Sequence, residues 1–273
     1  MPLKLHLSRL GAGFLLTLAM LACAAAVEAP PLVLLVQRLP REEMPVASIQ
    51  PLADYIADLT GRRCLVKMPP NFPAYWEAVR HAQYDLALDT PYFTDYRIQK
   101  FGFTVLVKTP ETTSYSLIMR ADTPVRDPGW LLGKRVASLG LLSVGTLRLN
   151  ALFPNPIRQP VLHEVHSSEE AIDLLRTRKV EAAFLPTSLI GRDSGRSGIV
   201  VVLTTEPIPR LVLSVSPRLA RELSNKVRNG LLHAHATKPG RTMLGAIGLD
   251  YFDAATNDEF ANQSYVLQGY WGY

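Results

Sequence analysis

Apolar runs and amphipathic stretches alternate along the first part of the chain. Residues 32–36 are all apolar, which is typical of a strand buried on both faces of a parallel sheet. Apolar side chains then recur at helical spacing over residues 45–61. A strand at 64–68, a helix capped by Asn71 and a strand at 85–88 continue the series. This βαβαβ order predicts a mostly parallel sheet with helices on both faces.

Strand and turn signals follow one another closely over residues 112–153. Residues 114–119 approach a period of two, which predicts a strand, and the turn formers crowded into 122–129 end it. A second strand is expected at 134–139, followed by a helix over 146–153 that stops at the prolines beyond it. We interpret this stretch as the entrance to a second lobe.

The rest of the chain repeats strands and helices. Strands are expected at 161–165, 180–185, 199–205 and 211–215. Helices are expected from the capping box at 167–170, from Ser216-Pro217 onward, and from the capping box at 256–259 through Tyr265.

The helix start near residue 143 is a candidate anion site. The first N–H groups of a helix have no partner inside it, so Ser143, Val144, Gly145 and Thr146 could surround an anion at the end of the sheet. The alternative is that Ser143 only caps the helix.

Further candidates lie at the carboxyl ends of strands, where open α/β sheets bind ligands. Tyr92 could instead pack beneath a helix, and His166 forms a His-x-x-His pair with His163. On a strand those two rings point to opposite faces, so we expect no metal site there. These ligand-binding candidates are Arg38, Thr90, Tyr92, His166 and Thr187.

The first 26 residues predict a secretory signal peptide. Lys4 and Arg9 precede an apolar core at 10–21, and small residues follow at the cleavage region. The core is shorter than the roughly 20 residues that a spanning helix needs, so we expect no membrane span in the mature chain. A lipoprotein signal with lipidation at Cys23 is the alternative.

Composition and missing motifs favour binding over catalysis. The formal net charge of +5 becomes +3 when Lys4 and Arg9 leave with the signal, and no dense basic block suggests nucleic acid. The mature chain has no phosphate-loop motif, no Gly-x-Ser-x-Gly elbow and no Cys-x-x-Cys, and Cys64 has no disulfide partner there. An acid/base pair of Asp85 and Asp89 in a secreted hydrolase is the alternative. We therefore expect no enzyme, no cofactor and no catalytic residues.

Two segments resemble the phosphate/phosphite/phosphonate-binding proteins of ABC importers. They are residues 119–123, Met-Arg-Ala-Asp-Thr, and residues 133–137, Gly-Lys-Arg-Val-Ala. Ser143 matches the first serine of that family's phosphate cradle, whereas Val144 and Gly145 stand where the family usually has Thr and Ser.

This resemblance implies an α/β, two-lobed, type II periplasmic-binding-protein-like fold with a hinge of two crossings. Lobe 1 would comprise 27–112 and 206–273, lobe 2 would comprise 113–205, and the strand at 211–215 would run antiparallel to its neighbours. The family's role would be to capture a small oxyanion in the periplasm for an ABC permease, here as a monomer. A periplasmic sensor that acts on a membrane receptor, or a binder of another small anion or heterocycle, is the alternative.

Overall fold

The computed structural model describes residues 29–38, 46–124, 126–140, 143–155, 157–190 and 198–268. The predicted signal peptide with Cys23 and residues 269–273 lie outside these residues. Residues from Pro31 onward form one compact unit, and all elements below belong to it. No helix of the described residues combines the length and the apolar character needed to cross a bilayer.

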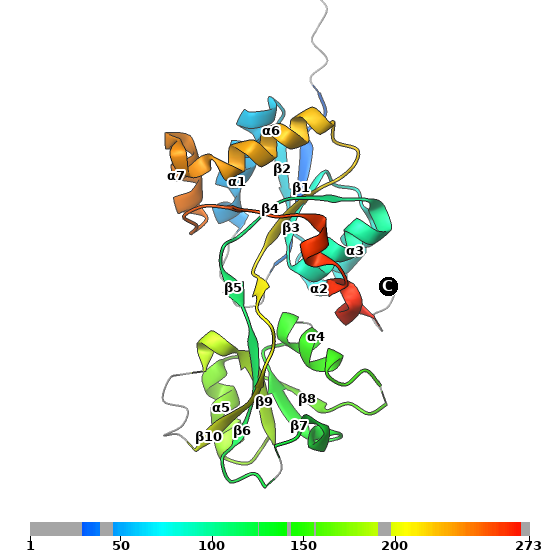
Figure 1. Cartoon of the computed structure of the whole chain (residues 1–273), viewed down its shortest axis with the longest axis vertical. Helices are drawn as coiled ribbons and strands as arrows, with labels where there is room; N and C mark the ends of the chain where they lie inside the picture. The colour runs from blue at the N-terminus through cyan, green and yellow to red at the C-terminus, as the bar shows by residue number, and fades with distance from the viewer. Residues whose placement is uncertain are drawn as a thin grey trace, which may run out of the picture. The chain divides into compact units, whose positions relative to one another are not determined.

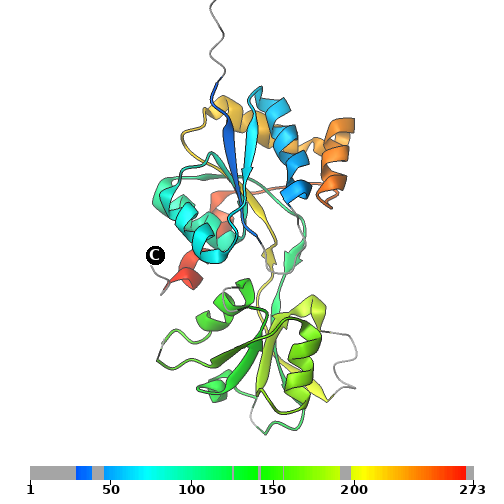
Figure 2. The ribbon, with the colours of Figure 1, turned by 180° about the vertical axis from the view of Figure 1, so that it is seen from behind.

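A six-stranded sheet and its helices form what we call the first lobe (Figures 1 and 2). The strand order is β13-β4-β12-β3-β1-β2. The strands are β1 (Leu32–Val36), β2 (Cys64–Lys67), β3 (Leu86–Asp89), β4 (Thr104–Lys108), β12 (Val212–Val215) and β13 (Asp253–Ala254). The helices are α1 (Val46–Thr60), α2 (Phe72–His81), α3 (Pro91–Phe101), α6 (Arg221–Leu232) and α7 (Lys238–Ala246), with short 3₁₀ turns at Ala234–Ala236, Asn257–Phe260 (η5) and Gln263–Leu267 (η6).

A five-stranded sheet and its helices form the second lobe. The strand order is β10-β6-β9-β7-β8. The strands are β6 (Tyr115–Arg120), β7 (Arg135–Ser138), β8 (Val161–Glu164), β9 (Ala182–Pro186) and β10 (Ile199–Thr204). The helices are α4 (Val144–Ala151) and α5 (Ser168–Arg176), with 3₁₀ turns at Pro128–Leu131 and Thr187–Leu189.

The first sheet carries one additional edge strand, β13, which is antiparallel to β4, and its other five strands have the same topology as the second sheet. Within each set of five, one strand runs against the others, β12 between β3 and β4 and β6 between β9 and β10. Each reversed strand follows directly after the chain has crossed from the other lobe (Figure 1). The two crossings pair with each other as a short antiparallel ribbon of β5 (Thr112–Thr113) and β11 (Ile208–Pro209). The fold is that of a two-lobed α/β protein with a two-crossing hinge.

Alternating side chains of the strands enter separate apolar cores. Leu32, Leu34 and Val36 of β1 pack with α1, α6 and α7, whereas Leu35 faces an aromatic cluster on α2 and α3. Because both faces of β1 are covered, all of its residues can be apolar. The second lobe is built in the same way, with α5 on one face of its sheet and α4 on the other.

Several helix ends agree with the sequence prediction and two do not. Asn71 caps α2, where its side chain accepts a hydrogen bond from the Ala74 N–H at 3.0 Å. The helix predicted from Ser216-Pro217 begins only at Arg221, because Ser216 closes a local turn that accepts the Arg218 and Leu219 N–H groups.

The last predicted helix is also wrong, since two separate 3₁₀ turns replace it. Asn262 lies between them with a left-handed φ of 64°. Tertiary hydrogen bonds hold this segment instead of helical ones. The Asn257 amide bonds the backbone of Phe103 and Val105 beside β4, and the Ser264 N–H donates to Asp95 at 2.7 Å.

Candidate functional site

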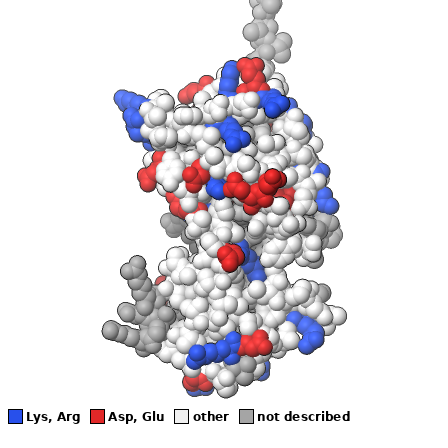
Figure 3. Space-filling model, viewed as in Figure 1, with Lys and Arg blue, Asp and Glu red and all other residues white. Residues whose placement is uncertain are grey.

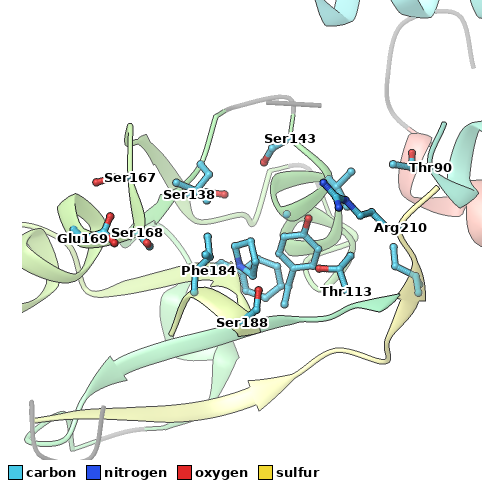
Figure 4. A pocket seen from close by; sticks show the side chains of 17 residues that line it. Thr90, Thr113, Ser138, Ser143, Ser167, Ser168, Glu169, Phe184, Ser188 and Arg210 are labelled. Atoms are coloured by element: carbon cyan, nitrogen blue, oxygen red, sulfur yellow. The ribbon is translucent and has the colours of Figure 1, made fainter. Parts of the chain in front are cut away.

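A cavity of about 440 Å³ lies where strand ends of both lobes meet the hinge ribbon (Figure 4). It is bounded by residues just after β3, β7, β8 and β9, by the start of β6, and by the crossing at β11. Its lining comprises Thr90, Thr113, Tyr115, Ser138, Leu139, Ser143, Val144, Gly145, Ser167, Ser168, Glu169, Phe184, Pro186, Ser188, Leu189, Ile208 and Arg210. Among the residues that the structure describes, the lining therefore combines many hydroxyl groups with an apolar wall and two charged side chains.

Three helices begin at this cavity. Thr90, Ser143 and Ser167 are the N-cap residues of α3, α4 and α5, and all three line it. The N-terminus of a helix carries a partial positive charge and unpaired N–H groups. Three such ends around one space favour a negatively charged ligand.

Ser143 both caps α4 and lines the cavity. Its Oγ accepts a hydrogen bond from the Thr146 N–H at 3.2 Å. The hydroxyl of Thr146 accepts from Ser143 Oγ at 3.3 Å and also bonds Ser138 Oγ at 2.9 Å and the Gly140 carbonyl oxygen at 2.7 Å. Thr146 therefore ties the helix start to the strand end, while Val144 and Gly145 of the first turn line the cavity.

Thr90 carries a buried hydroxyl that has no hydrogen-bond partner among the described residues. The residue is only 3% exposed, although it lines the cavity. Its N–H donates to the Gln37 side chain at 3.1 Å, and its hydroxyl does not cap α3. Buried hydroxyl groups are almost always paired, so an unpaired one at a cavity indicates a place for a ligand atom.

A buried ion pair holds the turn that carries Thr90. The Arg97 guanidinium donates to both oxygens of Asp89 at 2.7 and 2.5 Å, and both side chains are fully buried. Tyr75 and Thr94 donate to the same carboxylate. Burial alone would lower the pKa of Arg97, but the Asp89 charge raises it above its ordinary value. These bonds occupy both oxygens of Asp89, so its carboxylate serves structure.

The two charged residues of the lining lie toward opposite ends of the cavity in Figure 4. Arg210 lies near Ser143 and Thr90, whereas Glu169 lies near Ser167 and Ser168. The backbone N–H of Glu169 and these two serines bond its carboxylate, which lowers its pKa. Because Glu169 places its own negative charge at the start of α5, the Arg210 end of the cavity is electrostatically the more favourable end for an anion. On the face shown in Figure 3, by contrast, acidic and basic side chains are interspersed.

Aromatic rings form the apolar wall. The Tyr115 and Phe184 rings stack with centroids 5.9 Å apart and planes inclined by 13°. The edge of Tyr115 also lies against Gly145 in the first turn of α4, where a Cβ atom would come within 2.9 Å of the ring. Residue 145 must therefore be glycine as long as the Tyr115 ring keeps this position.

The structure brings some of the predicted site residues together. Thr90, Ser143, Val144 and Gly145 line the cavity. Tyr92 and Thr146 are fully buried next to it, and Tyr92 packs in the aromatic cluster of α2 and α3.

Five predicted site residues are not in the lining, namely Tyr92 and Thr146, which are buried, and Arg38, His166 and Thr187. Arg38 and His166 are exposed, and the Thr187 hydroxyl bonds Ser114 and Ser116 instead. Sequence reasoning missed Arg210 and Tyr115. Arg210 lies between the strands predicted at 199–205 and 211–215, and the pattern at Tyr115 indicated only an ordinary strand residue. The only available signal was that both lie beside the two hinge crossings.

Two lobes, a paired hinge and a cavity at the strand ends define a type II periplasmic binding protein. The profile of one family matches residues 39–260, and its description is ABC transporter, phosphonate, periplasmic substrate-binding protein. The chain belongs to this family. Such proteins bind a small ligand in the periplasm and deliver it to the permease of an importer.

Solved structures with the same fold have low sequence identity. XAC2383 from Xanthomonas citri, bound to ATP, has a TM-score of 0.66 at 17% identity, covering 86% of this chain and 97% of its own. PhnD1 from Prochlorococcus marinus, in complex with methylphosphonate, has a TM-score of 0.61 at 12% identity, with coverages of 87% and 98%. A phosphonate-transporter binding protein from Pseudomonas aeruginosa has a TM-score of 0.58 at 13% identity, with coverages of 85% and 84%. No curated protein sequence matches the chain.

Proposed function

We propose that this protein captures the oxyanion of a phosphorus compound at the Arg210 end of the cavity and delivers it to an ABC permease. The observation that carries the proposal is the convergence of the α3 and α4 N-termini with Arg210 around a buried, unpaired Thr90 hydroxyl. The methylphosphonate complex of PhnD1, which shares the fold, supports the choice of ligand class.

In this proposal, backbone groups supply much of the recognition. The first-turn N–H groups of Val144 and Gly145 would donate to the phosphoryl oxygens, and the Arg210 guanidinium would add a charge-assisted contact. The Thr90 hydroxyl would donate from the opposite lobe. Closure of the lobes about the paired crossings would then trap the ligand.

This arrangement does not need the side-chain hydroxyl groups that the family resemblance would place at residues 144 and 145. A backbone N–H is present at both positions whatever the side chain. Thr90, Ser143 and Arg210 add side-chain polar groups that do not depend on those positions. Phosphoryl binding is therefore compatible with Val144 and Gly145.

Calorimetry of the mature chain against phosphate, phosphite, methylphosphonate and sulfate tests the proposal. We expect at least one of the phosphorus oxyanions to bind. Arg210→Gln and Thr90→Val should each weaken that binding about 10- to 100-fold, because hydrogen bonds to charged groups contribute roughly 1.5–3 kcal/mol.

Matched controls separate binding from folding. Thr90→Ser retains the hydroxyl and should bind within a few-fold of the parent. Arg176→Gln removes a cation that pairs with Asp173 on α5 and is absent from the cavity lining, so it should change nothing. Absence of heat with all four anions, or unchanged affinity in Arg210→Gln, would contradict the proposal.

We also propose that residues 1–26 direct export and are then removed. Mass spectrometry of the protein from the host's envelope distinguishes the two forms of processing. A chain that starts near Val27 supports cleavage by the ordinary signal peptidase. A lipid-modified N-terminus at Cys23 would instead show that the protein is a membrane-anchored lipoprotein.

A further inference from the structure

The Tyr115 ring leaves no room for a side chain at residue 145. A Cβ atom at that position would meet Cε1 and Cδ1 of Tyr115 at 2.9 and 3.1 Å. Contacts of this length to a packed ring cannot be accommodated without moving it. Tyr115 and Gly145 therefore form this part of the cavity wall together.

The Tyr115 ring makes this part of the wall apolar and aromatic. Tyr115 is braced from behind, because its ring stacks on the buried Phe184 at an angle of 13°. Leu189, also in the lining, is 48% exposed although it is a large apolar residue. A ligand group that covers this wall would remove apolar surface from water.

The cavity is also much larger than a bare oxyanion. Its volume of about 440 Å³ equals the liquid volume of about 15 water molecules at about 30 Å³ each. Phosphate or methylphosphonate has five heavy atoms and would fill only a part near Arg210. The space between this end and Ser167 and Ser168 is bordered by Phe184 (Figure 4).

We propose that the ligand is an organophosphorus anion whose substituent is a planar ring, such as an aryl phosphonate or an aryl phosphate monoester. The phosphoryl group lies at the Arg210 end, as the proposed function requires, and the ring lies against Tyr115. Tyr115 and Gly145 then act together as the specificity-determining pair. Stacking between rings favours an aromatic substituent over a methyl group beyond the area that it buries.

Calorimetry with phenylphosphonate, methylphosphonate and phosphate tests this proposal. Phenylphosphonate should bind at least about tenfold more tightly than methylphosphonate, since ring stacking adds to the effect of buried apolar area. Tyr115→Phe keeps the ring and should keep this preference. Tyr115→Ala should reduce this preference to within about twofold, because the stacking ring is then absent. Gly145→Ser should also reduce it, because the new side chain displaces the ring.

The outcomes separate this proposal from the one on which it rests. If none of the three anions binds, the phosphorus-oxyanion function itself fails. If methylphosphonate or phosphate binds and phenylphosphonate binds no better, that function stands and the aromatic substituent is refuted. If Tyr115→Ala does not fold, Tyr115→Leu replaces it in the same comparison. Loss of methylphosphonate binding in a folded Tyr115 variant would overturn the placement of the ring, since Tyr115 would then serve the phosphoryl group.

Discussion

Replacing Arg97 with methionine tests the buried network beneath Thr90. Arg97 and Asp89 are 0% exposed, and two hydrogen bonds of 2.7 and 2.5 Å join them. Methionine fills much of the volume of arginine but leaves the carboxylate without its counter-charge. Breaking a buried ion pair in this way costs about 3–5 kcal/mol, because the remaining charge is desolvated and unpaired.

The size of the effect can be checked by replacing the partner of Arg97 in the ion pair. Asp89→Asn should cost a similar amount, because the Arg97 guanidinium then becomes the unpaired buried charge. The double variant should cost clearly less than the sum of the two, with a coupling of up to about 3 kcal/mol. Tyr75 and Thr94 donate to different oxygens of Asp89, and only one of them keeps an oxygen acceptor in Asp89→Asn. The loss of the other bond adds to the cost of this single variant.

Urea unfolding, with the midpoint and slope measured for all four proteins, provides the assay. For a chain of this size a loss of 3–5 kcal/mol corresponds to a decrease in Tm of roughly 10 °C. Arg176→Gln serves as the matched control, since that pair is exposed and should contribute under about 1 kcal/mol. A cost below 1 kcal/mol for Arg97→Met, or strict additivity in the double variant, would refute the reasoning.

Two further predictions concern stability. Gly240→Ala should destabilise by about 1–3 kcal/mol, because its Cβ would lie 2.2 Å from the Ala234 carbonyl oxygen, whereas Gly245→Ala in the same helix meets nothing within 4 Å and should stabilise by roughly 0.5–1 kcal/mol. Thermal unfolding of the two variants measures the difference, and equal effects of Gly240→Ala and Gly245→Ala would contradict this prediction. In alkali, stability should fall between about pH 10 and pH 12, because burial raises the pKa of Tyr84 and Tyr92 to about 12. The folded state then holds protons that the unfolded state releases, so each group costs about 1.4 kcal/mol per pH unit in this window. Urea unfolding at several pH values should show this fall in stability, and Tyr92→Phe should make it less steep. Stability that does not change between pH 10 and pH 12 would contradict the prediction.

The chain's local signals predicted the order of its elements well. Residues 32–36 were predicted as a doubly buried strand, and in the structure each face of β1 meets its own core. Ser167 caps α5 by accepting from the Glu170 N–H at 3.0 Å, as its capping box predicts. The return bond of that box differs, because the Glu170 carboxylate accepts from His166 and not from Ser167. Signals that involve a few adjacent residues therefore placed these elements well, although the helix predicted at 146–153 lies at Val144–Ala151.

Segments held by distant partners were predicted less well. The chain after Thr256 has a helical start signal, yet Asn257 and Ser264 bond residues near 103 and 95 instead. Such bonds join positions more than 150 residues apart and leave no periodic trace in the sequence. The helix start predicted too early at Ser216-Pro217 has a local cause instead, since Ser216 accepts the Arg218 and Leu219 N–H groups in a turn.

The sequence by itself determined the alternation of strands and helices, the helix N-terminus at Ser143 and the resemblance to a binding-protein family, because these depend on short-range order. Only the tertiary structure decided which groups share a cavity. Thr90, Tyr115 and Arg210 lie on separate elements, and the paired crossings of the hinge bring them together. The contact of Tyr115 with Gly145 is likewise invisible along the chain, since its physical cause is the exclusion of one side chain by a ring from another strand.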